Sequence, residues 1–146
     1  MPSPRLATRA VILHEDRLLL VNAWRDARSN LWCAPGGGAE PHASLPDNLI
    51  REVFEETGLT IAVGAPCLVN EFHDPGGRFH QVEVFFRATI TAGAISDHWK
   101  DPEGIVHTRR FFTRTEVAAL RLKPSSLPEV AWGAGFTYDP LEPIQH

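Results

Sequence analysis

One helix is delimited more sharply than any other element of this chain, and it constrains what can stand on either side of it. Ser44 is a good N-cap, Pro46 falls in the first turn, and Gly58 suits the left-handed position after a helix. These signals predict a helix from about Leu45 to Thr57. A single such helix between β-rich segments confines the chain to folds that combine strands with helices.

The segments around this helix have the composition of β-strands, rich in Val, Ile, Leu and Phe. Strands are predicted at Leu6–Leu13, Arg17–Asn22, Leu31–Ala34, Leu59–Phe72, Phe79–Thr91 and Ile105–Phe112. The first two would form one hairpin. The fourth and fifth would form another around the turn Asp74–Gly77.

Two further segments complete the prediction. The glycine run 36–38 is expected to be a loop, and Thr113 with Glu116 predicts a second helix from Arg114 to about Arg121. The order of elements predicts a single α/β domain over residues 1–146, with a mixed sheet and helices on its faces.

The net charge of -4 resides in one short segment. Of 18 acidic and 14 basic residues, five acids and one base lie between Gly37 and Leu59, which leaves 13 of each elsewhere. This balance argues against a protein that binds nucleic acid mainly through phosphate contacts, so no sequence-specific nucleic-acid partner is expected.

The lengths of the apolar segments bear on where in the cell the protein is expected. No apolar run approaches the roughly 18 residues that a membrane span requires, and no signal-peptide core is found at the N-terminus. We therefore expect a cytoplasmic protein with no membrane partner. Cys33 and Cys67 form no C-x-x-C pair and are predicted to be buried, reduced thiols.

Three carboxylates share one face of the predicted helix. At 100° per residue, Glu52, Glu55 and Glu56 fall within an arc of roughly 100°, apart from the apolar stripe that contains Leu49 and Val53. Carboxylates beside a glycine loop are ligands that hard divalent cations such as Mg²⁺ or Mn²⁺ prefer. The alternative is an acidic helix face that is simply solvated.

The segment 37–59 resembles the Nudix box, G-x5-E-x7-R-E-U-x-E-E-x-G-U, in which U is a bulky aliphatic residue. The positions that fit are Gly37, Arg51, Glu52, Val53, Glu55, Glu56, Gly58 and Leu59. The sequence departs from the pattern at Ala43, where the family has its first glutamate. In the family that residue supports the loop–helix junction and the metal environment. Its loss is expected to weaken or tune activity, and Glu40 is a hypothetical partial substitute.

The resemblance implies an α/β/α sandwich that hydrolyses, with Mg²⁺ or Mn²⁺, a diphosphate bond in a nucleoside diphosphate linked to another moiety. A nucleoside triphosphate, a nucleotide sugar or a dinucleotide would be such a small-molecule substrate. The implied metal ligands are Glu52, Glu55, Glu56 and the Gly37 carbonyl. Arg51 would hold Glu55 in place, and the implied catalytic residues are Glu52, Glu55 and Arg51, with Glu52 as the general base.

Residues outside the box complete the implied site. Glu103 is the candidate for a further metal ligand or base, with Asp101 as the alternative, although a carboxylate in a turn is also an ordinary surface feature. Arg25, Arg28 and Arg78 are candidates for substrate phosphate contacts, or else solvated loop arginines.

Two other functions fit the same pattern. Ala43 motivates a degenerate Nudix domain that senses nucleotides or binds a partner. An isomerase acting on isoprenoid diphosphates would use the same scaffold, but its Cys and Glu context is not recognisable around Cys33 or Cys67. The predicted hairpins would also permit a homodimer.

Overall fold

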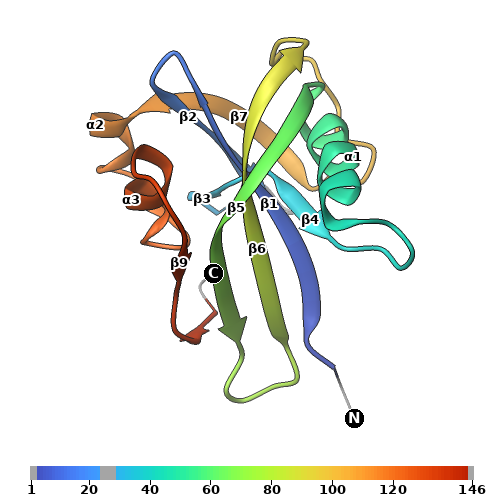
Figure 1. Cartoon of the computed structure of the whole chain (residues 1–146), viewed down its shortest axis with the longest axis vertical. Helices are drawn as coiled ribbons and strands as arrows, with labels where there is room; N and C mark the ends of the chain where they lie inside the picture. Colours follow the sequence, from blue (N-terminus) through green and yellow to red (C-terminus); the bar gives the residue numbers. More distant parts are fainter. Residues whose placement is uncertain (1–2, 24–28, 145–146) are drawn as a thin grey trace.

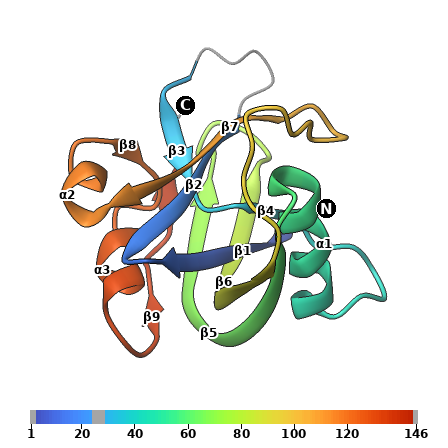
Figure 2. The same ribbon diagram turned by 90° about the horizontal axis from the view of Figure 1, so that it is seen from above.

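A curled sheet lies between helices on both of its sides. The computed structural model describes residues 3–23 and 29–144. Helix α1 (Leu45–Thr57) lies on one side of the sheet, and the short helices α2 (Arg114–Val117) and α3 (Leu127–Trp132) lie on the other (Figures 1 and 2). This arrangement confirms the predicted α/β/α sandwich.

The sheet mixes parallel and antiparallel pairs. Its strands are β1 (Arg5–His14), β2 (Arg17–Ala23), β3 (Leu31–Cys33), β4 (Gly36–Gly38), β5 (Thr60–His73), β6 (His80–Ala92), β7 (Val106–Thr113), β8 (Arg121–Leu122), β9 (Thr137–Tyr138) and β10 (Glu142–Pro143). The main order is β10-β5-β6-β1-β2-β3-β8, while β4 pairs with β1, β7 with β2 and β9 with β5. Strand β1 runs parallel to β6 and antiparallel to β2, and both predicted hairpins are confirmed.

The two larger apolar clusters of the described residues lie under α1 and under α2 with α3. The core under α1 includes Ile12, Leu19, Leu49, Val53, Leu59, Ile61 and Phe86. The core under α2 and α3 includes Val11, Leu18, Leu20, Phe85, Phe112, Leu127 and Val130. Because side chains alternate between the faces of a strand, neighbouring residues of β1 and β2 contribute to opposite cores.

Helix α1 has the predicted boundaries. The Ser44 hydroxyl accepts a hydrogen bond of 3.1 Å from the Asp47 N–H, and Gly58 ends the helix with φ 77°. Leu49 and Val53 are fully buried on the sheet side. The glutamates lie beside this apolar stripe on the helix surface, where Glu52 and Glu56 face β4.

The expectation of a loop at residues 36–38 is wrong, because these glycines form strand β4, antiparallel to β1. A Cβ on Gly36 would lie 1.9 Å from the Thr8 carbonyl oxygen, so the absence of side chains is what lets β4 approach β1. The glycines therefore allow β4 to pair closely with β1, and they do not form an irregular loop.

The second helix is shorter than expected. The capping box of Thr113 and Glu116 is present, but α2 ends at Val117 instead of about Arg121. Arg121 and Leu122 pair in parallel with β3 as β8, so non-local strand pairing overrides the helical propensity of this segment.

Cys33 and Cys67 are free and buried, as predicted. Over the residues described, no helix is long and apolar enough to cross a membrane.

Candidate functional site

Three carboxylates from two distant segments meet beside β4. Glu52 and Glu55 project from α1, and Glu103 belongs to the loop that precedes β7. One oxygen of each lies within 4.8 Å of the others. Such a set of hard oxygen donors suits a divalent cation. All three residues are among those that the sequence singled out as ligands.

Arg51 joins this cluster through hydrogen bonds to several oxygens. Its Nη1 donates to both carboxylate oxygens of Glu55, at 3.1 and 3.2 Å. Its Nη2 donates to Glu52 at 3.1 Å and to Asn48 Oδ1 at 3.0 Å, and it lies 3.3 Å from a Glu40 oxygen. One guanidinium thus offsets the repulsion among neighbouring carboxylates of the helix.

Strand β4 lies directly against the carboxylates of α1. A Cβ on Gly37 would lie 2.6 Å from Glu52 Oε2, so any side chain there would displace that carboxylate. The Gly36 N–H donates a hydrogen bond of 2.8 Å to Glu56 Oε1. The glycine backbone therefore positions two of the predicted ligands.

Burial changes the acidity of these two glutamates. Desolvation raises the pKa of Glu56, which is 6% exposed, to about 8, against the opposing effects of Arg9 and the Gly36 N–H. Desolvation also raises the pKa of Glu52, although Arg51 opposes it. Glu56 lines the same pocket as Glu52 but lies outside the group of three clustered carboxylates.

Asp101 shapes the turn that presents Glu103. Its carboxylate accepts hydrogen bonds from the backbone N–H groups of Glu103 at 3.0 Å, Ile105 at 3.1 Å and Val106 at 2.9 Å. Asp101, the alternative ligand, thus has its oxygens engaged in the turn, and Glu103 is the carboxylate that reaches the cluster.

Two residues that sequence reasoning missed fasten this loop to α1. Trp99 Nε1 donates to the Glu55 carbonyl oxygen at 2.7 Å. Arg109, which is buried in β7, donates from Nε to the Glu56 carbonyl at 2.7 Å and from Nη1 to the carbonyls of Ser96 and Trp99. One sequence signal could have indicated such contacts. The last turn of α1 contains no basic residue, although the free carbonyl groups at a helix C-terminus need hydrogen-bond donors.

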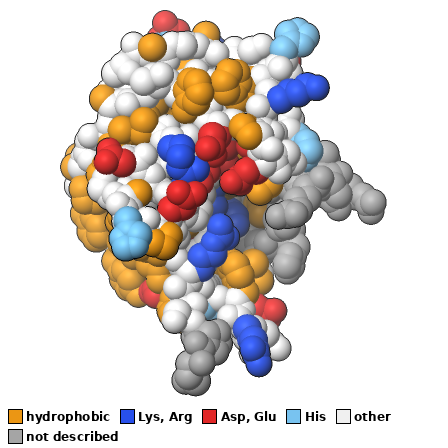
Figure 3. All heavy atoms as spheres, turned by 90° about the vertical axis from the view of Figure 1, so that its right-hand side faces the viewer, with side chains coloured by type: hydrophobic (Ala, Val, Ile, Leu, Met, Phe, Trp, Pro, Cys, Tyr) orange, Lys and Arg blue, Asp and Glu red, His pale blue; other side chains and the backbone are white. Residues whose placement is uncertain are grey.

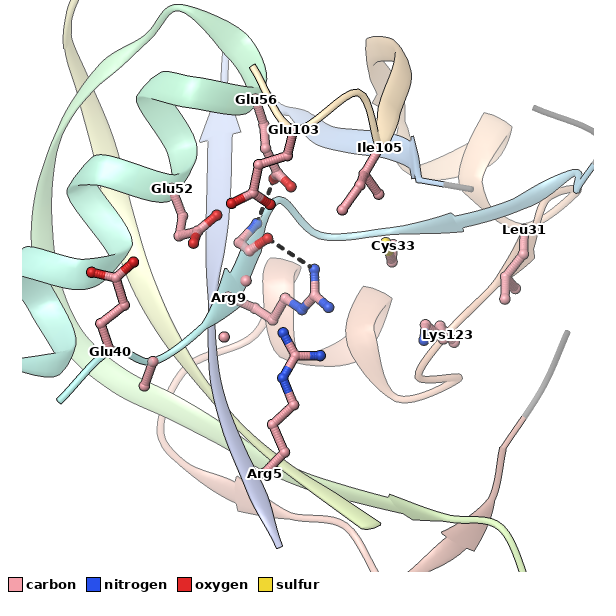
Figure 4. Close-up of a pocket in the computed structure, with 14 residues that line it drawn as sticks. Arg5, Arg9, Leu31, Cys33, Glu40, Glu52, Glu56, Glu103, Ile105 and Lys123 are labelled. Atoms are coloured by element: carbon pink, nitrogen blue, oxygen red, sulfur yellow. Dashed lines mark hydrogen bonds between the residues drawn. The ribbon is translucent and has the colours of Figure 1, made fainter. Parts of the chain in front are cut away.

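Two members of the cluster, Glu52 and Glu103, lie on one wall of a cavity of about 420 Å³ (Figure 4). Its charged lining residues are Glu40, Glu52, Glu56, Glu103, Arg5, Arg9 and Lys123. On the surface of this face, acidic side chains gather directly beside basic ones (Figure 3). The cavity therefore combines a wall suited to a cation with a wall suited to an anion.

The basic residues of this cavity were not among the predicted ones. Arg9 is paired with Glu83 at 2.7 Å, and Arg5 donates to the Gln81 side chain at 3.2 Å. Their spacing of four residues in β1 places both on one face of the strand, which is the signal that could have identified them.

The arginines that the sequence proposed for phosphate binding lie elsewhere. Arg25 and Arg28 fall outside the described residues. Arg78 lines a second hollow, at the β5–β6 turn, together with His73 and Phe79. The structure does not bring Arg78 to the cavity that holds the carboxylates.

Comparison with known proteins identifies the family. The family model of the NUDIX domain matches residues 3–133, which include every residue of the carboxylate cluster. This chain belongs to the Nudix family. Its Nudix box comprises β4, the loop that follows and α1, with Ala43 in the loop.

Among curated Nudix relatives, diphosphoinositol polyphosphate phosphohydrolase 3-beta of Bos taurus is 34% identical over 98 residues, which are 67% of this chain and 56% of that protein. The chain thus spans about half the length of this relative.

Solved structures share the fold over most of the chain. A UDP-X diphosphatase matches with a TM-score of 0.75 at 20% identity, over 95% of this chain and 68% of that one. An ADP-ribose pyrophosphatase from Streptococcus suis matches with a TM-score of 0.66 at 23% identity, over 97% of this chain and 100% of that one. At these identities the likeness shows the Nudix fold.

Proposed function

We propose that this Nudix chain hydrolyses a diphosphate bond in a small-molecule substrate and that it uses Mg²⁺, or Mn²⁺, to do so. The observation that carries the proposal is the meeting of Glu52, Glu55 and Glu103 beside a cavity that Glu52 and Glu103 line and whose other side is basic. The names of the similar proteins, a diphosphoinositol polyphosphate phosphohydrolase, a UDP-X diphosphatase and an ADP-ribose pyrophosphatase, support the same class of reaction.

The donor set fits a divalent cation. Glu52, Glu55 and Glu103 would hold it, because their oxygens already lie within 4.8 Å of one another. Glu56 and the Gly37 carbonyl are proposed as further ligands, since both residues line the same cavity. When bound, the cation would neutralise charge on the non-bridging oxygens of the diphosphate.

The chain itself would orient and deprotonate the attacking water. Glu52 is proposed as the general base, because its carboxylate lines the cavity that would hold the diphosphate. The water oxygen would bond to phosphorus, the bridging P–O bond would break, and the proton would pass to Glu52. Arg51 would hold Glu52 and Glu55 in position through its hydrogen bonds.

The test combines metal binding with turnover. The protein is stripped with EDTA and titrated with Mg²⁺ by calorimetry. Cleavage of the diphosphate bond is then followed by chromatography of the products for nucleoside triphosphates, nucleotide sugars, ADP-ribose and diphosphoinositol polyphosphates. We expect Glu55→Gln and Glu103→Gln to lower Mg²⁺ affinity at least tenfold and to reduce turnover further, since each removes a charged oxygen donor. Glu129→Gln, an exposed position of α3, is the matched control.

One outcome would favour the other candidate function. A protein that binds Mg²⁺ but hydrolyses no member of the panel would be the sensing or partner-binding module that Ala43 suggests. Turnover that survives in both glutamine variants would contradict the proposed site.

A further inference from the structure

Two cations of the cavity have no carboxylate partner within the described part of the chain. Arg5 bonds to the neutral amide of Gln81, with Nη1 at 3.2 Å from Oε1. Lys123 Nζ lies 4.9 Å from the centre of the Phe72 ring. Arg9, by contrast, is 2.7 Å from Glu83. Since cations in a hollow attract anions when no counter-charge neutralises them, Arg5 and Lys123 are free to serve a ligand.

The fold holds the Arg5 guanidinium at the cavity. It lies against β4, because a Cβ on Gly38 would be 2.5 Å from Arg5 Nη2. Its partner Gln81 is buried and donates in turn to Glu83 at 2.9 Å. Both neighbours restrict where the guanidinium can point, and Figure 4 shows it within the cavity below the carboxylates.

Lys123 reaches the cavity from a different part of the fold. It follows β8, and its backbone N–H donates to the Trp32 carbonyl at 3.1 Å. Figure 4 places it away from both the carboxylates and Arg5, on another part of the lining. A ligand that contacts both cations must therefore extend beyond the carboxylate wall.

We propose that Arg5 and Lys123 bind further phosphate groups of the substrate, so that the cavity selects small molecules carrying phosphates beyond the diphosphate that is cleaved. The inference rests on the proposed function, which places the diphosphate at the carboxylate cluster. A phosphate group has about -1.5 to -2 charges and three acceptor oxygens, which match the planar donors of arginine and the point charge of lysine.

A binding experiment tests the subsite without turnover. The probe is inositol hexakisphosphate, which has phosphate monoesters and no diphosphate bond, titrated by calorimetry into the protein in EDTA. We expect Arg5→Gln and Lys123→Gln each to weaken binding about tenfold, and Arg5→Lys to weaken it less. Arg110→Gln, which removes an exposed cation outside the cavity lining, should leave the Kd unchanged. Absent binding, or equal Kd values for all variants, would overturn the proposal.

A kinetic experiment tests the selectivity. With Mg²⁺ present, we expect each glutamine variant to lower kcat/KM for a diphosphoinositol polyphosphate about tenfold, and to change kcat/KM for ADP-ribose less than twofold. Equal losses for both substrates would overturn the inference, because the cations would then contact the diphosphate itself. If neither compound is hydrolysed, the hexakisphosphate titration alone decides the subsite, and the proposed function fails only if no member of the substrate panel is hydrolysed.

Discussion

The indole Nε1 of Trp99 donates a hydrogen bond of 2.7 Å to the backbone carbonyl of Glu55. The Trp99 ring also packs edge-to-face on Phe54, with centroids 5.4 Å apart, and lies so close to Gly58 that a Cβ there would be 2.9 Å from it. The loop that carries Glu103 is thereby fastened to the helix that carries the other clustered carboxylates.

Trp99→Phe should weaken the metal site without unfolding the protein. Phenylalanine retains much of the ring packing on Phe54 but loses the hydrogen bond, which is worth about 0.5–1.5 kcal/mol. We expect Mg²⁺ affinity to fall roughly twofold to tenfold in calorimetry. Trp132→Phe removes a similar bond to Asp16, outside the cavity lining, and should leave the affinity unchanged. Equal affinities for wild type and Trp99→Phe would contradict a positioning role.

Arg109→Met should destabilise the fold. The buried guanidinium donates to the carbonyls of Glu56, Ser96 and Trp99, and methionine would leave these acceptors unpaired. We expect a loss of about 2–4 kcal/mol in urea unfolding, together with weaker Mg²⁺ binding. The exposed neighbour Arg110→Met is the control, with an expected change below about 0.5 kcal/mol. A small effect at Arg109 would show that water replaces its bonds.

Glu56→Gln should stabilise the metal-free protein at alkaline pH. Below the ordinary pKa of 4.5, both the folded and the unfolded chain hold the Glu56 proton, so the substitution changes the free energy of unfolding little. Between pH 4.5 and about 8 the unfolded chain releases the proton while the folded chain keeps it, so wild-type stability falls as pH rises.

The expected gain at pH 8 is on the order of a few kcal/mol, because glutamine removes the cost of keeping this carboxyl protonated in the fold, while its amide oxygen still accepts from the Gly36 N–H. Thermal unfolding in EDTA at pH 5 and pH 8 measures it. Glu129→Gln should show no such pH dependence, and a gain for Glu56→Gln that is the same at both pH values would refute the assignment.

Gly37→Ala should displace the Glu52 carboxylate. The new methyl group would meet Glu52 Oε2 at 2.6 Å, and the flexible glutamate would move rather than the strand. We expect Mg²⁺ affinity to fall about tenfold, with little change in melting temperature. Gly76→Ala in the β5–β6 turn, where the nearest atom is 3.7 Å away, is the matched control. Unchanged affinity would show that Glu52 has room to bind metal in another position.

Glu40→Gln tests whether Glu40 compensates for Ala43. Glu40 contacts Arg51 at 3.3 Å, but its side chain is 64% exposed, and exposed ion pairs contribute only about 0.2–1 kcal/mol. We therefore expect Mg²⁺ affinity to fall less than about fivefold. Ala43→Glu should restore the affinity in the Glu40→Gln background. No recovery would show that position 43 is unimportant in this protein.

Helix α1 and its carboxylates follow from local sequence. Ser44 and Gly58 set the ends of the helix, and its periodicity separates Leu49 and Val53 from the glutamates, because capping and helical geometry depend only on near neighbours. The Nudix box was recognisable for the same reason, since its residues have constant spacing along one continuous segment.

Tertiary structure decided which residues meet at the site. The glycines 36–38 became a strand because β1 is there to pair with them, and α2 ended early because β8 pairs with β3. Arg5 and Lys123 come from opposite ends of the chain and share a cavity only through the sheet. Local sequence thus determined the helix and the carboxylates that we propose as metal ligands. The position of Arg5 and Lys123 at the same cavity depends on contacts between distant segments, and no local sequence pattern encodes those contacts.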